Sequence, residues 1–453
     1  MQNRMTSGNP MSLILKFTIP LLLGNIFQQL YNLCDTVLVG KFVGKDALAA
    51  VGSTGTVVFL LMGFTNGMVT GFTILTSQRY GAKDDDGTKK TVSTGFILCI
   101  AMIAIVTTIS LLTVKNLLIL MKTPTDIFDN AYKYLSIICM GIFATVFNNY
   151  FSSLVRAIGN SKAPLCFLLF SASLNVILDL LFIVKFGYGV VGAAWATVIS
   201  QASSAVLCFC YIMFKVPSLR PSRKHLKLDV KIAKTQVILG IPMALQFGIT
   251  ASGTIVMQSA INRFGSTAVA AFTAAQKTQG ILNQGMFTIG QTMAAYVGQN
   301  YGSRDMKRIR QGIIASLKIF AIYSVVSAVL IITFLKPTLT IFFEKGTDIT
   351  PFLPFARTYI LESASCYMFL AMIFIYRNSM QAVGHGVAAM VMGISELVAR
   401  LITSFISIQM HSYWLAVASD PLAWAAAGIL GIFLCRGVLK KVESKWELNP
   451  QDV

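Results

Sequence analysis

Long apolar segments alternate with short polar ones along the whole chain of 453 residues. A mainly apolar segment of about 18 or more residues is long enough to cross a bilayer as an α-helix. Helices also satisfy their own backbone hydrogen bonds, as a segment surrounded by lipid must. The pattern therefore predicts an all-α membrane protein with twelve transmembrane helices. They are expected near residues 15–40, 47–79, 92–114, 131–156, 163–184, 189–214, 236–262, 268–299, 311–335, 354–382, 387–410 and 414–438.

The composition agrees with this pattern. Hydrophobic residues make up 55% of the chain and charged residues only 12%. A soluble protein carries about 25% charged residues. The mean hydropathy of +0.69 has the same meaning. These values exclude an ordinary soluble enzyme or binding module.

The positive charge of the chain has a topological explanation. The net charge is +19, and the densest group of Lys and Arg lies between Lys215 and Lys234, after the sixth predicted helix. Loops rich in Lys and Arg stay on the cytoplasmic side of a membrane. We therefore expect both termini and this linker to be cytoplasmic and to contact anionic lipid headgroups. No nucleic-acid partner is expected.

The sequence contains an internal repeat. Gly44-Lys-Asp-Ala-Leu-Ala-Ala-Val51 corresponds to Gly265-Ser-Thr-Ala-Val-Ala-Ala-Phe272, and Gln78-Arg-Tyr-Gly resembles Gln299-Asn-Tyr-Gly at the same separation. Six helices per half keep both copies in one orientation, so the halves are related about an axis along the membrane normal. We predict two pseudo-symmetric six-helix bundles. The domains are an N-lobe (1–214), a basic linker (215–235) and a C-lobe with the C-terminal tail (236–453).

Polar residues inside the predicted N-lobe helices are candidates for an ion site. Asp35 lies near the outer end of the first helix, and Asn175 and Asp179 share one face of the fifth. Thr197 enters from the outer end of the sixth helix. Placing a carboxylate within a membrane span costs free energy, so such residues are usually retained for a function. Two carboxylates, an amide and a hydroxyl can carry a proton or bind a hard cation such as Na⁺.

The C-lobe has a different polar pattern. Glu396 and Arg400 occupy the positions that correspond to Asn175 and Asp179, and their i, i+4 spacing suits an ion pair. Lys277 lies within the eighth helix; it either lines a cavity and pairs with Glu396 or acts as a structural counter-ion. The candidate residues of a substrate cavity are Gln246, Lys277, Gln279, Gln284, Glu396 and Arg400.

Several motifs together resemble the multidrug and toxic compound extrusion (MATE) family over nearly the whole chain. They are Cys34-Asp-Thr-Val-Leu-Val-Gly40, Gln78-Arg-Tyr-Gly-Ala82, Arg156-Ala-Ile-Gly-Asn160, Leu174-Asn-Val-Ile-Leu-Asp179 and Gly192-Ala-Ala-Trp-Ala-Thr197. The resemblance implies a V-shaped pair of six-helix lobes that exports organic, often cationic, compounds in exchange for protons or sodium. It also implies coupling through an N-lobe site at Asp35, Asn175, Asp179 and Thr197.

The sequence departs from the family pattern at one position. Other members carry an essential Glu in the seventh helix, where this chain has Thr250. A coupling site on that helix is therefore not expected, which favours the predicted site in the N-lobe.

The functional prediction is an antiporter for small-molecule drugs or metabolites, driven by H⁺ or Na⁺, in a bacterial or archaeal inner membrane. We expect a monomer with no cofactor and no enzymatic activity, because no nucleophile–base constellation is found. The chain also lacks a G-x-x-x-x-G-K-[ST] phosphate-binding loop, which argues against ATP as the energy source. A flippase for a lipid or lipid-linked substrate and a gradient-independent channel are the alternatives.

Overall fold

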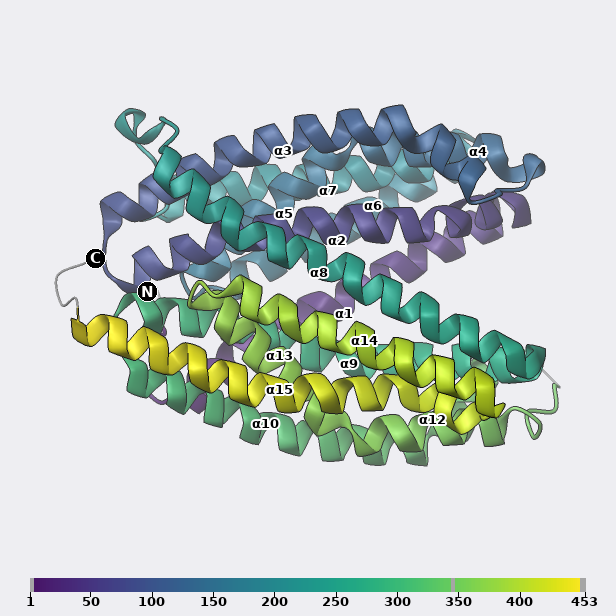
Figure 1. The fold of residues 1–453 in the computed structure, drawn as a ribbon. Helices are drawn as coiled ribbons and strands as arrows, with labels where there is room; N and C mark the ends of the chain where they lie inside the picture. Colours follow the sequence, from purple (N-terminus) through teal and green to yellow (C-terminus); the bar gives the residue numbers. More distant parts are fainter. Residues whose placement is uncertain (1–3, 344–346, 449–453) are drawn as a thin grey trace. The chain divides into compact units, whose positions relative to one another are not determined.

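The computed structural model describes residues 4–343 and 347–448, and these residues are almost entirely helical (Figure 1). The α-helices are α1 (Pro10–Phe42), α2 (Lys45–Gly81), α3 (Asp85–Leu120), α4 (Thr125–Met140), α5 (Ile142–Ala157), α6 (Lys162–Asp179), α7 (Gly189–Lys215), α8 (Val230–Ile261), α9 (Gly265–Gly302), α10 (Met306–Thr333), α11 (Leu335–Phe342), α12 (Leu353–Ser365), α13 (Tyr367–Ala382), α14 (Gly386–Met410) and α15 (Tyr413–Leu448). No strand occurs in the described residues.

The helices account for the twelve predicted spans. Within the described residues, nine helical segments are long and apolar enough to cross a membrane, and two bent helix pairs raise the number to eleven. One of the nine segments, Val230–Gly302, contains both α8 and α9, which are separated by a short 3-10 turn at Asn262–Phe264. Helices α8 (32 residues) and α9 (38 residues) are each long enough to cross a bilayer, so counting them separately by length gives twelve spans.

Two of the predicted spans are bent. The fourth consists of α4 and α5, at 44° to each other, and the tenth consists of α12 and α13, at 50°. The break between α4 and α5 falls at Gly141, where the Val198 side chain occupies the space that a Cβ atom would need. The two bends lie at corresponding places in the two halves of the sequence, so the structure follows the internal repeat.

The fifth predicted span changes its helical geometry next to a candidate site residue. Helix α6 ends at Asp179 and continues as a π-helical turn at Leu180–Lys185. Such turns are rare, and they occur frequently at functional sites because they shift the register of the side chains that follow.

The chain forms two compact units. The first is built on Ile19–Ala244, and the second combines Met5–Thr18 with the chain from Leu245 onward. Helices α1 and α8 therefore each contribute to both units. The division falls beside Pro20 in α1 and beside Pro242 in α8. A proline inside a helix removes one backbone hydrogen bond and allows a bend, which suits a helix that passes from one unit to the other.

The beginning of α8 packs tightly on the first unit. A Cβ atom on Gly67 of α2 would lie 2.6 Å from the Ala244 Cα atom, and a Cβ atom on Gly71 would collide with the Gly240 backbone. Gln236 is fully buried, and its side-chain amide donates to the carbonyl oxygens of Phe72 and Thr91, at 2.9 and 3.0 Å. Small residues thus allow the backbones of α2 and α8 to come into contact.

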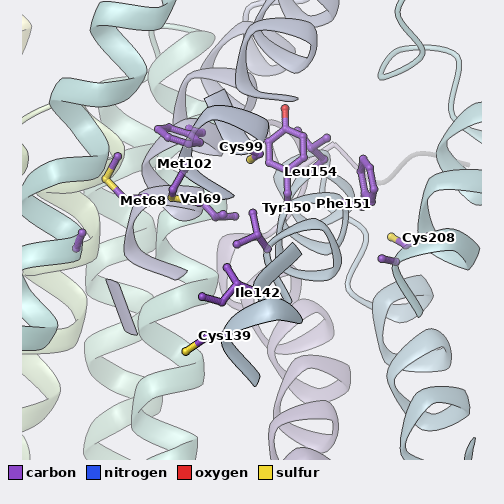
Figure 2. Packing of buried hydrophobic residues seen from close by; sticks show 14 of the residues in the cluster. Met68, Val69, Cys99, Met102, Cys139, Ile142, Tyr150, Phe151, Leu154 and Cys208 are labelled. Atoms are coloured by element: carbon purple, nitrogen blue, oxygen red, sulfur yellow. The ribbon is translucent and has the colours of Figure 1, made fainter. Parts of the chain in front are cut away.

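The hydrophobic core of the first unit lies where α2, α3, α5 and α7 pack together. Figure 2 shows part of this core, with Tyr150 of α5 beside Cys99 of α3. The Tyr150 hydroxyl donates to the Val92 carbonyl oxygen at 2.6 Å, so its polar end is satisfied. Cys99 is fully buried and its thiol is free. It therefore acts as a small apolar packing residue.

The second unit holds the start of α1 through polar contacts. The Arg308 guanidinium donates to the carbonyl oxygens of Met5 and Gly8, at 3.1 and 2.9 Å. The hydroxyl groups of Thr18 and Thr292 lie 2.9 Å apart in a buried position. Helices α9, α13, α14 and α15 form the centre of this unit (Figure 1). Helices α13, α14 and α15 carry the buried ionic residues of this unit.

Candidate functional site

The first unit brings Asp35 and Asp179 together. Asp35 projects from the second half of α1 and is partly buried, whereas Asp179, the last residue of α6, is completely buried. Their carboxyl groups lie within electrostatic range of each other, and both oxygens of Asp179 are without a hydrogen bond. Two carboxylates that are far apart in the sequence thus lie near each other inside one helix bundle.

Several polar atoms around this pair are buried without a hydrogen bond. They are Asp35 Oδ1, both carboxylate oxygens of Asp179, and both polar side-chain atoms of Asn175, one helical turn before Asp179. A buried polar group without a partner costs free energy, and an unpaired buried charge costs much more. The group of atoms is therefore suited to hold a proton or a cation, which would compensate this cost.

Two tyrosines that the sequence analysis did not identify belong to the same group. The Tyr31 hydroxyl donates to Thr197 Oγ1 at 3.4 Å, and both Tyr31 and Tyr134 lie within electrostatic range of the two carboxylates. Tyr31 precedes Asp35 by four residues and shares its helix face, so that spacing could have revealed it. Tyr134 on α4 approaches from another helix, and only the fold could reveal it.

Thr197 lies at the edge of the group. Its hydroxyl donates to the Ala193 carbonyl oxygen at 3.1 Å and accepts the Tyr31 hydrogen bond. Ser200, one turn further along α7, donates to the Thr197 carbonyl oxygen at 3.0 Å. We use the name acidic cluster for Asp35, Asn175, Asp179, Thr197, Tyr31 and Tyr134. Its carboxylate, amide and hydroxyl oxygens are ligands for a proton or for Na⁺.

The acidic cluster is not a typical site for a transition metal. Among the described residues, no group of three or more His, Cys, Asp or Glu side chains is arranged to hold a metal ion. Two carboxylates without a thiolate or an imidazole suit a hard, weakly held cation better than zinc or copper.

The second unit contains a buried network of four ions. Glu396 bonds directly to Arg377 and lies 3.7 Å from Arg400, and Arg400 Nε donates to Asp420 Oδ1 at 2.7 Å. All four residues are less than 9% exposed. The ion pair between Glu396 and Arg400 is therefore present. The sequence analysis overlooked Arg377 on α13 and Asp420 on α15.

Neutral residues complete this network. The Gln246 amide of α8 lies between Arg377 and Gln381, 3.0 Å from a nitrogen of each. A Cβ atom on Gly253 would lie 2.8 Å from an Arg400 nitrogen, so only glycine leaves room for the guanidinium there. We use the name ion network for Arg377, Glu396, Arg400 and Asp420.

Lys277 is separate from the ion network. Its side chain is exposed, and no ion pair or hydrogen bond of its ammonium group is found among the described residues. Glu396 pairs with arginines instead, so a Lys277–Glu396 pair is absent from the described part of the chain. Gln279 is 1% exposed and lies beside the Tyr367 hydroxyl, while Gln284 is half-buried. Of the predicted cavity residues, Gln279, Glu396 and Arg400 are enclosed within the unit, and Lys277 is the most accessible.

These features define the class of protein. The chain is a multi-pass membrane protein with two repeat-based units, and each unit encloses charged or titratable side chains within its helices. Such an arrangement is typical of secondary transporters, in which paired helix bundles surround polar sites inside the membrane.

Comparison with known proteins identifies the family. The sequence pattern of the MatE family matches residues 20–181 and again residues 242–406. The chain therefore belongs to the MatE family of membrane transporters, and the double match agrees with the internal repeat.

Individual similarities extend over most of the chain. The chain is 28% identical over 385 residues to "Probable multidrug resistance protein YpnP" from Bacillus subtilis, covering 84% of each. It is 22% identical over 393 residues to "FAD transporter" from Shewanella oneidensis, covering 85% of each. Its fold matches the crystal structure titled "MATE in complex with MaL6" with a TM-score of 0.90, at 21% identity, over 97% of this chain and 99% of that one.

Proposed function

We propose that this protein is a secondary active antiporter that exports small organic compounds, drugs among them, in exchange for H⁺ or Na⁺. Relatives named as multidrug resistance proteins support the class of substrate. The observation that supports ion coupling is the set of buried, unpartnered atoms on Asp35, Asn175 and Asp179.

In the proposed mechanism, the charge of the acidic cluster controls the packing of α1 against α6. When a proton or Na⁺ compensates the Asp35–Asp179 pair, the two carboxyl groups can remain close. When the ion leaves, two like charges face each other in a medium of low dielectric constant and repel strongly. Because α1 contributes residues to both units, a shift of α1 reaches both of them. Ion release and substrate movement would then be coupled.

The direction of transport in this proposal follows from the distribution of Lys and Arg along the chain. By the positive-inside rule, we propose that the Lys- and Arg-rich linker and both termini are cytoplasmic. Compounds then move from the cytoplasm outward while the ion moves inward.

The proposed function is tested by export from proteoliposomes. Purified protein is reconstituted with ethidium, and an imposed pH or sodium gradient is applied in turn. We expect Asp35→Asn to abolish uphill export, because an amide neither releases a proton nor supplies a full negative charge to Na⁺. Asp129→Asn is the matched control, since Asp129 is exposed on α4 and pairs with the neighbouring Lys133.

Each result of this test has a distinct meaning. Export that one gradient drives, and that only Asp35→Asn abolishes, supports the proposal and identifies the coupling ion. Unchanged gradient-driven export by Asp35→Asn contradicts coupling through the acidic cluster. If ethidium only runs down its own concentration gradient, whatever ion gradient is imposed, the result contradicts antiport.

A further inference from the structure

The depth of Lys277 in the membrane is unusual for an unpaired ammonium group. Helix α9 begins at Gly265, so Lys277 lies about 18 Å along its axis at about 1.5 Å per residue. Measured from the predicted start of the span at residue 268, it is about 14 Å deep in a hydrocarbon core of about 30 Å. A charge at this depth that faced lipid would cost about 3 kcal/mol or more. The position therefore favours contact with water.

The residues around Lys277 also indicate a water-facing surface. Thr273 and Gln284 share its helix face, at i−4 and i+7, and Gln276 precedes it. Thr273 is exposed and Gln284 half-buried. Ile281, at i+4, is 64% exposed and is the large apolar residue of this surface. A lipid-facing stripe is apolar throughout, whereas this face carries polar groups of the kind that orient a ligand, beside an apolar side chain.

Lys318 in the same unit shows the opposite pattern. It is also exposed and lies within a predicted span, on α10. Its neighbours at i−4, i+4 and i+7 are Ile314, Ile322 and Val325, which are 54, 68 and 65% exposed. An exposed stripe of large apolar residues is typical of a lipid-facing surface, on which a lysine can extend its ammonium group toward the headgroups. The contrast shows that Lys277 differs from a lysine that is merely tolerated at a lipid surface.

The acidic residues of the second unit's ion network are already committed to other partners. Glu396 bonds to Arg377 and Arg400, and Asp420 bonds to Arg400. The network therefore balances two positive charges with two negative ones. Lys277 adds a positive charge for which the described residues provide no partner.

We propose that Lys277 and the polar stripe of α9 form a binding subsite for an anionic group of the transported compound. This inference rests on the proposed transport function and adds an organic anion or zwitterion to its substrates. An ammonium group is a compact point charge with three donors, so it accepts carboxylate, phosphate or sulfonate without strict geometric selection. The Gln284 side-chain amide supplies a further donor, and Ile281 contacts the apolar part of the compound, while the Thr273 hydroxyl donates to the Val269 carbonyl oxygen at 2.8 Å and only adds polarity to this face.

The test compares two fluorescent probes in proteoliposomes, the organic cation ethidium and the organic anion carboxyfluorescein. Wild type is measured beside Lys277→Gln, which removes the charge, and Lys277→Arg, which keeps it. Lys318→Gln is the matched control. We expect Lys277→Gln to raise the half-saturating concentration of the anion roughly tenfold or more, the effect of one lost charge-assisted hydrogen bond. Lys277→Arg and Lys318→Gln should export the anion as wild type does, and Lys277→Gln should not weaken ethidium export, because it removes a charge of the same sign as ethidium.

Three outcomes would overturn the inference. The first is no export of the anion by wild type while Asp35-dependent ethidium export persists, which leaves the proposed function intact. The second is unchanged anion export by Lys277→Gln. The third is an equal loss of both probes in Lys277→Gln, which indicates a structural role. Failure of wild type to export either probe under any gradient would contradict the proposed function as well.

Discussion

The ion network of the second unit gives a quantitative prediction about stability. Glu396 is the only carboxylate that bonds to Arg377 in the described part of the chain, whereas Arg400 has both Asp420 at 2.7 Å and Glu396 at 3.7 Å. Glu396→Gln therefore leaves the buried Arg377 charge without an anion, and Arg377→Gln leaves one arginine to balance two carboxylates. Each single variant has an uncompensated buried charge. The double variant is neutral again and keeps the Arg400–Asp420 pair.

The expected magnitude follows from burial. Removing one member of a buried ion pair costs about 3–5 kcal/mol, because the remaining charge stays desolvated. At roughly 2 °C per kcal/mol, the lower end of the range for domains of about 200 residues, each single variant should lose about 6–10 °C in Tm. If the two sites were independent, the double variant would lose the sum of both effects. We expect it to lose no more than either single variant.

The assay is the thermal stability of the purified protein in detergent, followed by size-exclusion chromatography after heating. Arg357→Gln is the matched control, because Arg357 is exposed on α12 and its charge does not depend on a buried partner. Its Tm should stay within about 1 °C of wild type, as is usual for an exposed substitution.

Two results would refute this reasoning. Additive losses in the double variant would show that Arg377 and Glu396 do not interact energetically. Single variants as stable as Arg357→Gln would show that water or movement of the helices compensates the stranded charge.

Two further predictions concern the first unit. Gly71→Ala should lower the free energy of unfolding by about 1–3 kcal/mol, because its Cβ atom would collide with the Gly240 backbone. Gly248→Ala on α8 meets no atom within 4 Å and serves as the control, so equal Tm values for the two variants would contradict the close contact. Tyr31→Phe removes the hydroxyl that bonds to Thr197 at 3.4 Å, and it should raise the ion concentration for half-maximal export about 2–10-fold while export continues. Complete loss of export would instead indicate that Tyr31, like Asp35, is essential for coupled export.

The sequence by itself determined the membrane architecture. Apolar length gives the spans because the bilayer thickness sets how many residues a helix needs. The internal repeat gives the two halves, and rare polar residues within apolar segments, Asp35 and Asp179 among them, identify candidate ion ligands. The spacing of Glu396 and Arg400 on one helix also gives their ion pair, since i and i+4 side chains meet on the same face.

The tertiary structure decided which side chains meet across different helices. Tyr134 approaches Asp35, and Arg377 and Asp420 complete the network around Glu396, although long stretches of chain separate them. Helical periodicity shows which residues share a face of one helix. It does not show which helices pack together or how each is rotated about its axis, because side-chain packing between helices fixes both. Lys277 is a further example. Its charge is evident in the sequence, but whether an acidic residue of the described chain pairs with it depends on where α13, α14 and α15 place those residues.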